Sequence, residues 1–392
     1  MVVLEFRWCI INVVLMKVRR AYKFKLYSSD KLAKVASVAG SCRFVWNQVL
    51  ALNLERLEQG KPIMRYNEAA KLLPEWKRTE ALGWLKSVNA QALQQKLRDL
   101  DRAFLDCFDK KQPNKRTPRF KKRGKSVDSF RIPTAPKLVD NKIYVPKIGW
   151  LRYFKSREIE GRPCNFTISR AVDGFYVSIQ TEIEMPEQTE ITPIKPVGID
   201  LGVNQHATLS DGAIYRLPSM TELKAKKKRL QQELARRKKF GANWRKTKRK
   251  LGRLERKMAR VRKDFLHKTS TEIVKNHDAV YVEDLEITKM TAKVVGTGAG
   301  VKRRLNRSIL EQGWGEFRRQ LEYKAHAANA RYNQVPAPYT SQRCSSCDHV
   351  HPKNRTSQST FKCTSCGLAL NADHNAAINI LRLGHEPSVL AC

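Results

Sequence analysis

The chain has 392 residues, and 76 lysines and arginines against 37 aspartates and glutamates give it a formal net charge of +39 at pH 7. A compact protein with this much like charge repels itself, so the composition predicts a polyanionic partner, and nucleic acid is the obvious candidate. A disordered, solvating tail is disfavoured, because 41% of the residues are hydrophobic and 7 Trp, 14 Phe and 11 Tyr supply material for cores. The length predicts two to four domains.

The cysteines indicate a reducing compartment, because four of the nine stand in two close pairs and an odd total fits a disulfide framework poorly. The apolar stretch Met1–Met16 is interrupted by Glu5 and Arg7 and is shorter than the roughly 20 residues that span a bilayer. We therefore expect neither an export signal nor a membrane anchor. Met16 opens an alternating, strand-like run, so residues 1–15 are interpreted as a possible start-site extension that carries no fold.

The first half of the chain combines helical and extended patterns. Residues 28–108 repeat apolar side chains at three- and four-residue steps, which predicts a helical subdomain. Residues 110–125 hold nine basic residues in sixteen, with two prolines and a glycine, which predicts an extended basic connector that contacts a phosphate backbone. Short β-type runs follow, as in a small barrel or sheet, at Lys142–Val145, Asn165–Arg170 and Gly174–Glu182.

The second half begins after a polar linker, residues 187–196. Apolar runs on either side of an Asp211-Gly212 turn predict a three-strand meander: Val197–Val203, Ala207–Leu209 and Ala213–Leu217. Two long helices in a hairpin are expected next, with a break at Gly241–Asn243. The remaining expected elements are a strand at Ala279–Leu285, a mobile loop at Lys293–Arg304, a helix from Ser308 to about Arg331, a strand at Tyr332–Pro336 and a last helix at Asn375–Leu383.

The predicted helical hairpin is strongly basic: residues 222–263 contain twenty lysines or arginines and three acidic residues. A solvated charged face is the plain alternative to a binding surface. Each unpaired like-charge neighbour costs a few tenths of a kcal/mol, however, and ion pairs within the helices cannot neutralise the excess. A phosphate backbone laid against the helices would remove this repulsion.

Two close cysteine pairs predict a structural zinc ribbon. The pairs are Cys344 with Cys347 and Cys363 with Cys366. Four thiolates form a closed site with no open position for catalysis, whereas a redox dithiol fits this spacing poorly. Each cysteine pair forms a turn, here called a knuckle. The second knuckle is followed by Gly367, whereas Asp348 occupies the equivalent position after the first, so we expect the first knuckle to be distorted. His349 and His351 are the less favoured alternative ligands.

Three carboxylates stand in apolar surroundings: Asp200 in one strand, Glu283 in a second strand, and Asp373 at the start of the last helix. Any one of them alone is more often a turn or cap residue. Together they predict a site for two Mg²⁺ or Mn²⁺ ions, since ionised carboxylates beside apolar strands need compensation. Such a site hydrolyses phosphodiesters. The order Asp, Glu, Asp resembles a RuvC nuclease of the RNase H-like fold.

The order of the motifs from Met16 to about Leu383 resembles the TnpB (OrfB) family of insertion-sequence proteins, relatives of type V CRISPR effectors. The motifs that carry the resemblance, besides the cysteine pairs, are Tyr22–Tyr27, Gly40–Asn47, Pro118–Lys121, Val197–Gly202, Asp264–Lys268, Val282–Leu285, Gly313–Phe317 and Asp373–Ile380. The family's metal-binding triad falls on Asp200, Glu283 and Asp373, and all three are present.

The resemblance implies an RNA-guided DNA endonuclease that binds a noncoding guide RNA from its own element and cuts double-stranded DNA beside a short target-adjacent motif. The implied fold is mixed α/β and multidomain: a β-barrel-like wedge domain (16–30 and 118–194), an inserted helical recognition lobe (31–117), and a RuvC-like (RNase H-like) nuclease domain (195–338 and 370–392) with an inserted zinc ribbon (339–369). The expected location is the prokaryotic cytoplasm, associated with the nucleoid. No membrane partner and no small-molecule substrate are expected.

Candidate nucleic-acid contacts are of two kinds. By resemblance, Tyr66, Gln94 and Arg131 fall near positions that contact the target-adjacent motif. The basic runs add Arg119, Lys121, Lys122, Arg123, Arg236, Arg237 and Lys238. Two alternatives stay open: a guided repressor or accessory transposition protein without cleavage, and a strand-transfer transposase.

Overall fold

The computed structural model describes residues 15–124, 126–186, 192–292, 296, 298–336 and 338–385. The expected extension thus lies almost wholly outside the described residues, as do residues 187–191 of the expected linker and residues 386–392. The chain divides into two compact units, Met1–Glu187 and Gln188–Cys392. Both mix helices and strands, which confirms a mixed α/β, multidomain class. None of the described helices combines the length and the apolar character needed to cross a bilayer.

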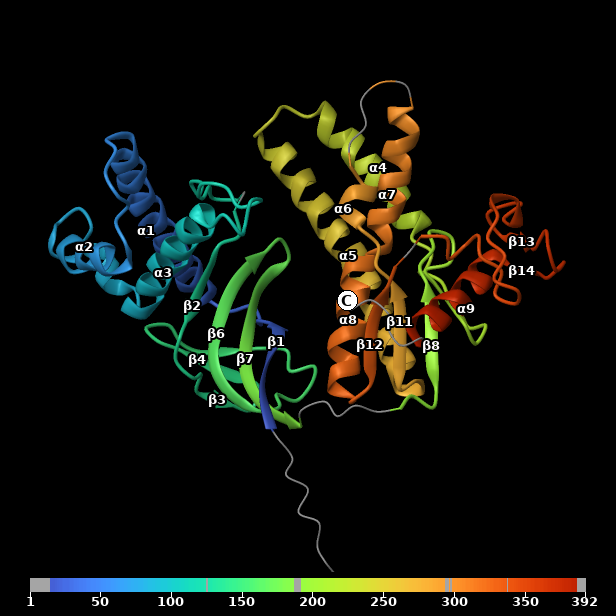
Figure 1. The fold of residues 1–392 in the computed structure, drawn as a ribbon. Helices are drawn as coiled ribbons and strands as arrows, with labels where there is room; N and C mark the ends of the chain where they lie inside the picture. The colour runs from blue at the N-terminus through green and yellow to red at the C-terminus, as the bar shows by residue number, and fades with distance from the viewer. Residues whose placement is uncertain are drawn as a thin grey trace, which may run out of the picture. The chain divides into compact units, whose positions relative to one another are not determined.

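Two antiparallel sheets form the strand part of the first unit (Figure 1). The larger sheet has the order β1-β7-β6-β2, with β1 at Leu15–Lys25, β7 at Gly174–Pro186, β6 at Arg162–Ala171 and β2 at Ser129–Ile132. The smaller sheet contains β3 (Leu138–Val139), β4 (Lys142–Val145) and β5 (Gly149–Arg152). A bridge between Leu26 and Tyr153 joins them, and both of these side chains are buried. The pairing thus gives two linked sheets.

The helices of the first unit confirm the expected helical subdomain. They are α1 (Leu32–Glu58), α2 (Tyr66–Arg78), the short 3₁₀ helix η1 (Gly83–Ser87) and α3 (Ala90–Phe108). Asn89 caps α3, since its Oδ1 accepts a hydrogen bond from the backbone N–H of Ala92 at 3.3 Å. Buried side chains at three- and four-residue spacing on α1 and α3, such as Val45 and Leu97, share one core with the strands.

A five-stranded sheet is the centre of the second unit, with the order β10-β9-β8-β11-β12. The strands are β8 (Pro196–Asp200), β9 (Ala207–Leu209), β10 (Ile214–Tyr215), β11 (Ala279–Glu283) and β12 (Arg331–Val335). β8, β9 and β10 form the expected antiparallel meander, whereas β11 runs parallel to both β8 and β12. The carboxyl ends of β8 and β11 therefore lie at the same edge of the sheet.

The helical hairpin is confirmed as α4 (Thr221–Arg236) and α5 (Ala242–Asn276). The expected loop and single helix after β11 are wrong in part. Following the short α6 (Ile287–Met290), α7 (Ala299–Gln312) already includes residues 299–304, and a second helix, α8 (Trp314–Ala327), ends before residue 331. Gly313 separates α7 from α8 because it adopts a left-handed backbone conformation, with φ of 74°.

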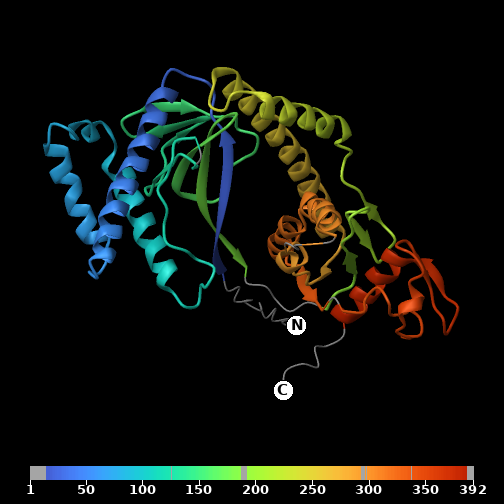
Figure 2. The same cartoon turned by 90° about the horizontal axis from the view of Figure 1, so that it is seen from above.

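The last helix, α9 (Ala372–His385), lies beside β8 (Figures 1 and 2). Two glycines allow α9 to approach the sheet closely, one where it meets β8 and one where it meets β11. A Cβ at Gly198 would lie 2.2 Å from the carbonyl oxygen of Ala377, and one at Gly384 would lie 2.2 Å from the ring of Tyr281. Before α9 comes a small segment with η2 (Pro352–Asn354) and the two-stranded sheet of β13 (Thr360–Lys362) and β14 (Ala369–Asn371).

Candidate functional site

Two of the predicted carboxylates end neighbouring parallel strands. Asp200 is the last residue of β8, and Glu283 is the last residue of β11. Val282 lies opposite Ile199 in the register, so the next step places Glu283 opposite Asp200. Since side chains alternate between faces, both carboxylates share the sheet face of Gly198, which is the face that α9 covers.

Asp373 reaches the same place from α9. It lies in the first helical turn, where the Oδ1 of Asn371 accepts hydrogen bonds from the backbone N–H groups of Asp373 and His374 at 3.0 and 3.3 Å. A Cβ at Gly202, two residues beyond Asp200, would lie 3.9 Å from the Oδ2 of Asp373. The structure therefore brings the three predicted carboxylates to one face and one edge of the sheet.

The three carboxyl groups act on one another electrostatically. Burial raises the pKa of Asp200 well above its usual range, and the nearby Glu283 and Asp373 raise it further. Burial also raises the pKa of Glu283 and of Asp373. Arg355 opposes all three shifts, and its Nη2 lies 3.7 Å from the Oδ1 of Asp373. One cation against three carboxylates leaves an excess of negative charge.

This donor set fits divalent cations. Carboxylate oxygens are the hard ligands that Mg²⁺ and Mn²⁺ prefer. Among the described residues, only the four cysteines bring three or more ligand atoms within 4.8 Å of one another. The three carboxylates do not form such a tight group.

Three residues that the sequence analysis missed position or balance the carboxylates: Arg318, Thr340 and Arg355. The hydroxyl of Thr340 donates a 2.5 Å hydrogen bond to the Oε1 of Glu283. The guanidinium of Arg318, on α8, donates to the backbone oxygens of Glu283 and Leu285 at 3.3 and 3.1 Å. No local sequence signal marks these residues, because each comes from a different element.

The four predicted cysteines converge. The Sγ atoms of Cys344 and Cys366 are 3.6 Å apart, as are those of Cys347 and Cys363. A zinc ion with Zn–S bonds of about 2.3 Å places its four sulfurs about 3.8 Å apart, so this arrangement fits a structural zinc site. His349 and His351 are not part of the cluster, and His349 Nε2 lies 3.1 Å from the hydroxyl oxygen of Thr364.

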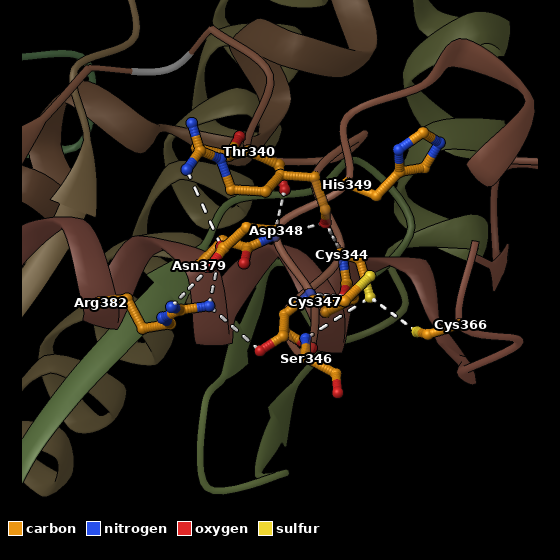
Figure 3. Close-up of polar contacts among 12 residues, drawn as sticks. Thr340, Cys344, Ser346, Cys347, Asp348, His349, Cys366, Asn379 and Arg382 are labelled. Carbon is orange, nitrogen blue, oxygen red and sulfur yellow. Dashed lines mark hydrogen bonds and ion pairs between the residues drawn. The ribbon is translucent and has the colours of Figure 1, made fainter. Parts of the chain in front are cut away.

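The expected distortion of the first knuckle is wrong. In both knuckles the first cysteine N–H donates to a carbonyl five residues on, and the carbonyl of that cysteine accepts from the N–H four residues on. Asp348 takes the same left-handed conformation as Gly367, with φ of 61° against 76°. Its carboxylate accepts two hydrogen bonds from Arg382 at 2.9 and 3.0 Å, which accounts for an aspartate at this position (Figure 3).

Two asparagines of α9 tie the cysteine ribbon to the carboxylates. Asn375 and Asn379 are buried, and the Nδ2 of each donates a 2.8 Å hydrogen bond to the carbonyl of Arg343, just before Cys344. Asn379 also donates to the carbonyl of Thr340, the residue that holds Glu283 (Figure 3). The helix that carries Asp373 thus holds both the ribbon and Thr340, which hydrogen-bonds to Glu283.

The residues expected near the target-adjacent motif lie on one helical surface and a neighbouring strand. Tyr66 begins α2, and the guanidinium of Arg98 lies 4.5 Å from its ring centroid. Gln94 is exposed one turn before Arg98 on α3. Arg131 is on β2, and its Nε is buried without a hydrogen bond among the described residues.

The basic connector contains no helix among its described residues, as expected, and α1 holds it. The Nε1 of Trp46 donates to the carbonyl of Arg119 at 3.1 Å. The side-chain amide of Asn47 accepts from the backbone N–H of Lys121 at 2.8 Å and donates to its carbonyl at 3.0 Å. The ammonium of Lys121 lies 3.4 Å from the ring centroid of Trp46, and burial lowers its pKa to about 8. Lys121 is therefore engaged within the fold, whereas Arg119, Lys122 and Arg123 are exposed.

On the helical hairpin, Arg236 and Lys238 are exposed, and Arg237 is paired. The guanidinium of Arg237 hydrogen-bonds to Glu233, which also accepts a 3.0 Å hydrogen bond from the hydroxyl of Thr247 on α5. Arg237 therefore helps to close the hairpin.

Three family models match the chain. They are described as "Probable transposase" (OrfB of IS605, residues 178–294), "Cas12f1-like, TNB domain" (residues 314–380) and "Helix-turn-helix domain" (residues 16–62). The structure has strand β1 and the single long helix α1 in the segment that the last model matches.

The chain is also similar to individual proteins and to solved structures. The chain is 43% identical to the "Putative RNA-guided DNA endonuclease InsQ" of Escherichia coli (strain K12), over 96% of this chain and 94% of that protein. It is 29% identical to a "Putative RNA-guided DNA endonuclease" of Streptomyces pristinaespiralis, over 95% and 90%. Its fold resembles a solved Cas12f1 complex with a single guide RNA and target DNA (TM-score 0.52, 15% identity, 93% of this chain and 98% of that chain). The chain belongs to the TnpB (OrfB) family of insertion-sequence proteins.

Proposed function

We propose that this protein is an RNA-guided DNA endonuclease that cuts with the Asp200, Glu283 and Asp373 carboxylates. The observation that carries the proposal is the convergence of these three groups on one sheet face, with Arg355 beside Asp373. Two relatives named as putative RNA-guided DNA endonucleases support it, because the chain matches each of them over nearly its full length.

The carboxylates would hold two Mg²⁺ or Mn²⁺ ions, which would supply Lewis-acid stabilisation and a more acidic water for phosphodiester hydrolysis. The chain's own groups prepare this site. Thr340 and Arg318 fix the side chain and backbone of Glu283, and the capped start of α9 fixes Asp373. Arg355 places positive charge beside Asp373, where it can attract a phosphate.

We assign the nuclease domain of RuvC type to the sheet of the second unit and the zinc ribbon to the four-cysteine segment. The two linked sheets of the first unit would be the wedge domain, and α1 to α3 the recognition lobe. The basic connector and hairpin would contact a guide RNA, supplied by the element, and the DNA paired with it. Base pairing would then read the target sequence, and the protein would recognise the shape and charge of the heteroduplex. The proposed location is the prokaryotic cytoplasm, with nucleoid DNA.

The test begins with the full chain purified together with its bound RNA. Sequencing that RNA defines a matching DNA target, which is incubated with the complex and Mg²⁺. We expect cleavage by the wild type, none by Asp200→Ala, and equal RNA content in both. No cleavage of any matching target by the wild type would overturn the nuclease assignment. A wild type that binds matching DNA without cutting it, with binding unchanged in Asp200→Ala, would favour a guided binder. Joining of element ends by the protein alone would favour a transposase.

A further inference from the structure

The outer face of the smaller sheet carries aromatic and basic side chains that the proposed site does not use. Along β5 and its continuation, Trp150, Arg152 and Phe154 point outward, because the alternate residues Leu151 and Tyr153 are buried. Lys142 and Tyr144 on β4 lie opposite Arg152 and Trp150, and Tyr27 at the end of β1 joins on the other side. We name these six outward residues the β5 platform: Tyr27, Lys142, Tyr144, Trp150, Arg152 and Phe154.

The aromatic rings of the platform are held in place yet exposed. Tyr27 and Phe154 stack with ring centroids 3.7 Å apart, and Tyr144 meets Trp150 edge-on at 5.5 Å. The four rings keep between 36% and 46% of their surface exposed. Single exposed apolar residues are common on proteins, but four rings gathered at β4, β5 and the segments that follow β1 and β5 form a patch that marks a binding surface.

The charge of the platform selects the ligand. Among the described residues, neither Lys142 nor Arg152 has an acidic partner, and the guanidinium of Arg152 lies 5.4 Å from the ring centroid of Tyr27. The hydrophobic core beneath the strands, including Ile143 and Leu151, holds the backbone rigid. Rings alternating with unpaired cations suit a ligand with flat apolar faces and negative charge.

We propose that the β5 platform binds unpaired nucleotides of a single-stranded nucleic acid, stacking bases on Trp150 and Phe154 while Arg152 and Lys142 contact the phosphates. Bases in a duplex present only their edges, so ring-to-base stacking requires an unpaired base. The proposal rests on the nucleic-acid binding of the proposed function but not on cleavage. RNA and DNA share this chemistry, and the test separates them.

The test measures base stacking apart from charge. The full chain, freed of RNA at high salt, is titrated with a fluorescent twelve-nucleotide DNA and with an abasic DNA of equal length and charge. We expect the wild type to prefer the base-bearing strand and Trp150→Ala and Phe154→Ala each to reduce that preference by about 5-fold or more. Trp84→Ala is the matched control, since Trp84 is a 45% exposed tryptophan of the same unit, packed against Phe44, outside the platform. An RNA strand of the same sequence shows which sugar is preferred.

A second measurement keeps the proposal testable if a variant folds poorly. The wild type is photocrosslinked to 4-thiouridine RNA and to 4-thiothymidine DNA, and the modified peptides are mapped by mass spectrometry. Crosslinks at Trp150, Tyr144 or Phe154 would support the platform. Equal binding of base-bearing and abasic strands by the wild type, or crosslinks only elsewhere, would overturn it. A wild type that cuts matching DNA but shows no preference for the base-bearing strand counts against the platform alone, whereas a wild type that shows the preference but does not cut counts against the nuclease alone.

Discussion

Gly198→Ala tests whether the packing of α9 on β8 builds the carboxylate site. The added Cβ would lie 2.2 Å from the carbonyl oxygen of Ala377 and 2.5 Å from the backbone nitrogen of Leu381. Ordinary contacts begin at 3.4 Å, and both neighbours are backbone atoms that cannot rotate away. The helix must therefore move by roughly 1 Å, which typically costs about 1–3 kcal/mol for an overpacked core.

Two readouts follow from this displacement. For a unit of this size, about 1–3 kcal/mol corresponds to a fall in the melting temperature of about 2–12 °C. Because α9 carries Asp373, a shift of roughly 1 Å is also expected to slow DNA cleavage by about 100-fold. Both are measured on purified protein, by thermal unfolding and by single-turnover cleavage, with RNA content as a check that the first unit is intact.

Gly300→Ala is the matched control, because nothing lies within 4 Å of the Cβ that it would add and Gly300 is the second residue of helix α7. Its melting temperature should be equal to or above that of the wild type, since alanine favours helix over glycine by about 1 kcal/mol. Wild-type melting and wild-type cleavage by Gly198→Ala would refute the described packing of α9 and the dependence of the site on it.

Four further outcomes are expected. Cys363→Ser should lose bound zinc by elemental analysis and lower the melting temperature, whereas Cys164→Ser, outside the cluster, should do neither. The raised carboxyl pKa values mean that the folded state binds protons more tightly than the unfolded one, so without Mg²⁺ they destabilise the fold as the pH rises above about 4. Asp200→Asn should therefore melt higher than the wild type at pH 8 in magnesium-free buffer, and a difference that did not shrink at pH 5 would contradict this. Burial lowers the pKa of His206 to about 4, so up to about 3 kcal/mol of stability should be lost between pH 6.5 and 4, and urea unfolding of His206→Phe should show less of this loss. RNA affinity should fall log-linearly with salt, and a flat response would count against a basic binding surface.

Local patterns were enough to predict most helices and strands. The hairpin of α4 and α5 follows from apolar periodicity, and the meander of β8 to β10 follows from its Asp211-Gly212 turn. The break between α7 and α8 was missed because apolar positions continue across Gly313, although this glycine adopts a left-handed conformation. Glycine and lysine content suggested a loop where α7 begins, although three-dimensional packing can make such a segment helical.

The sequence was enough to identify the three carboxylates but not to predict how they are arranged in space. Each carboxylate was visible as an acidic residue at the end of an apolar strand or the start of a helix. Their shared face depends on the parallel pairing of β8 with β11, which no local pattern contains. The number of basic residues in a segment also does not show which of their side chains face a ligand and which contact the rest of the protein. Lys121 and Arg237 stand in basic runs, yet one lies on Trp46 and the other on Glu233, and their contact with nucleic acid stays a prediction.

The placement of Asp373 on α9 has a consequence for synthesis of the protein. A ribosome that has translated through Glu283 has produced β8, β11 and two carboxylates, but not the helix that covers them. The ribbon cysteines follow 61 to 83 residues later, Asp373 follows ninety residues later, and Asn379, which anchors Thr340, comes after it. Under the proposed function, a nascent chain or one truncated before α9 would lack one of the three cutting carboxylates, even with its basic surfaces already made.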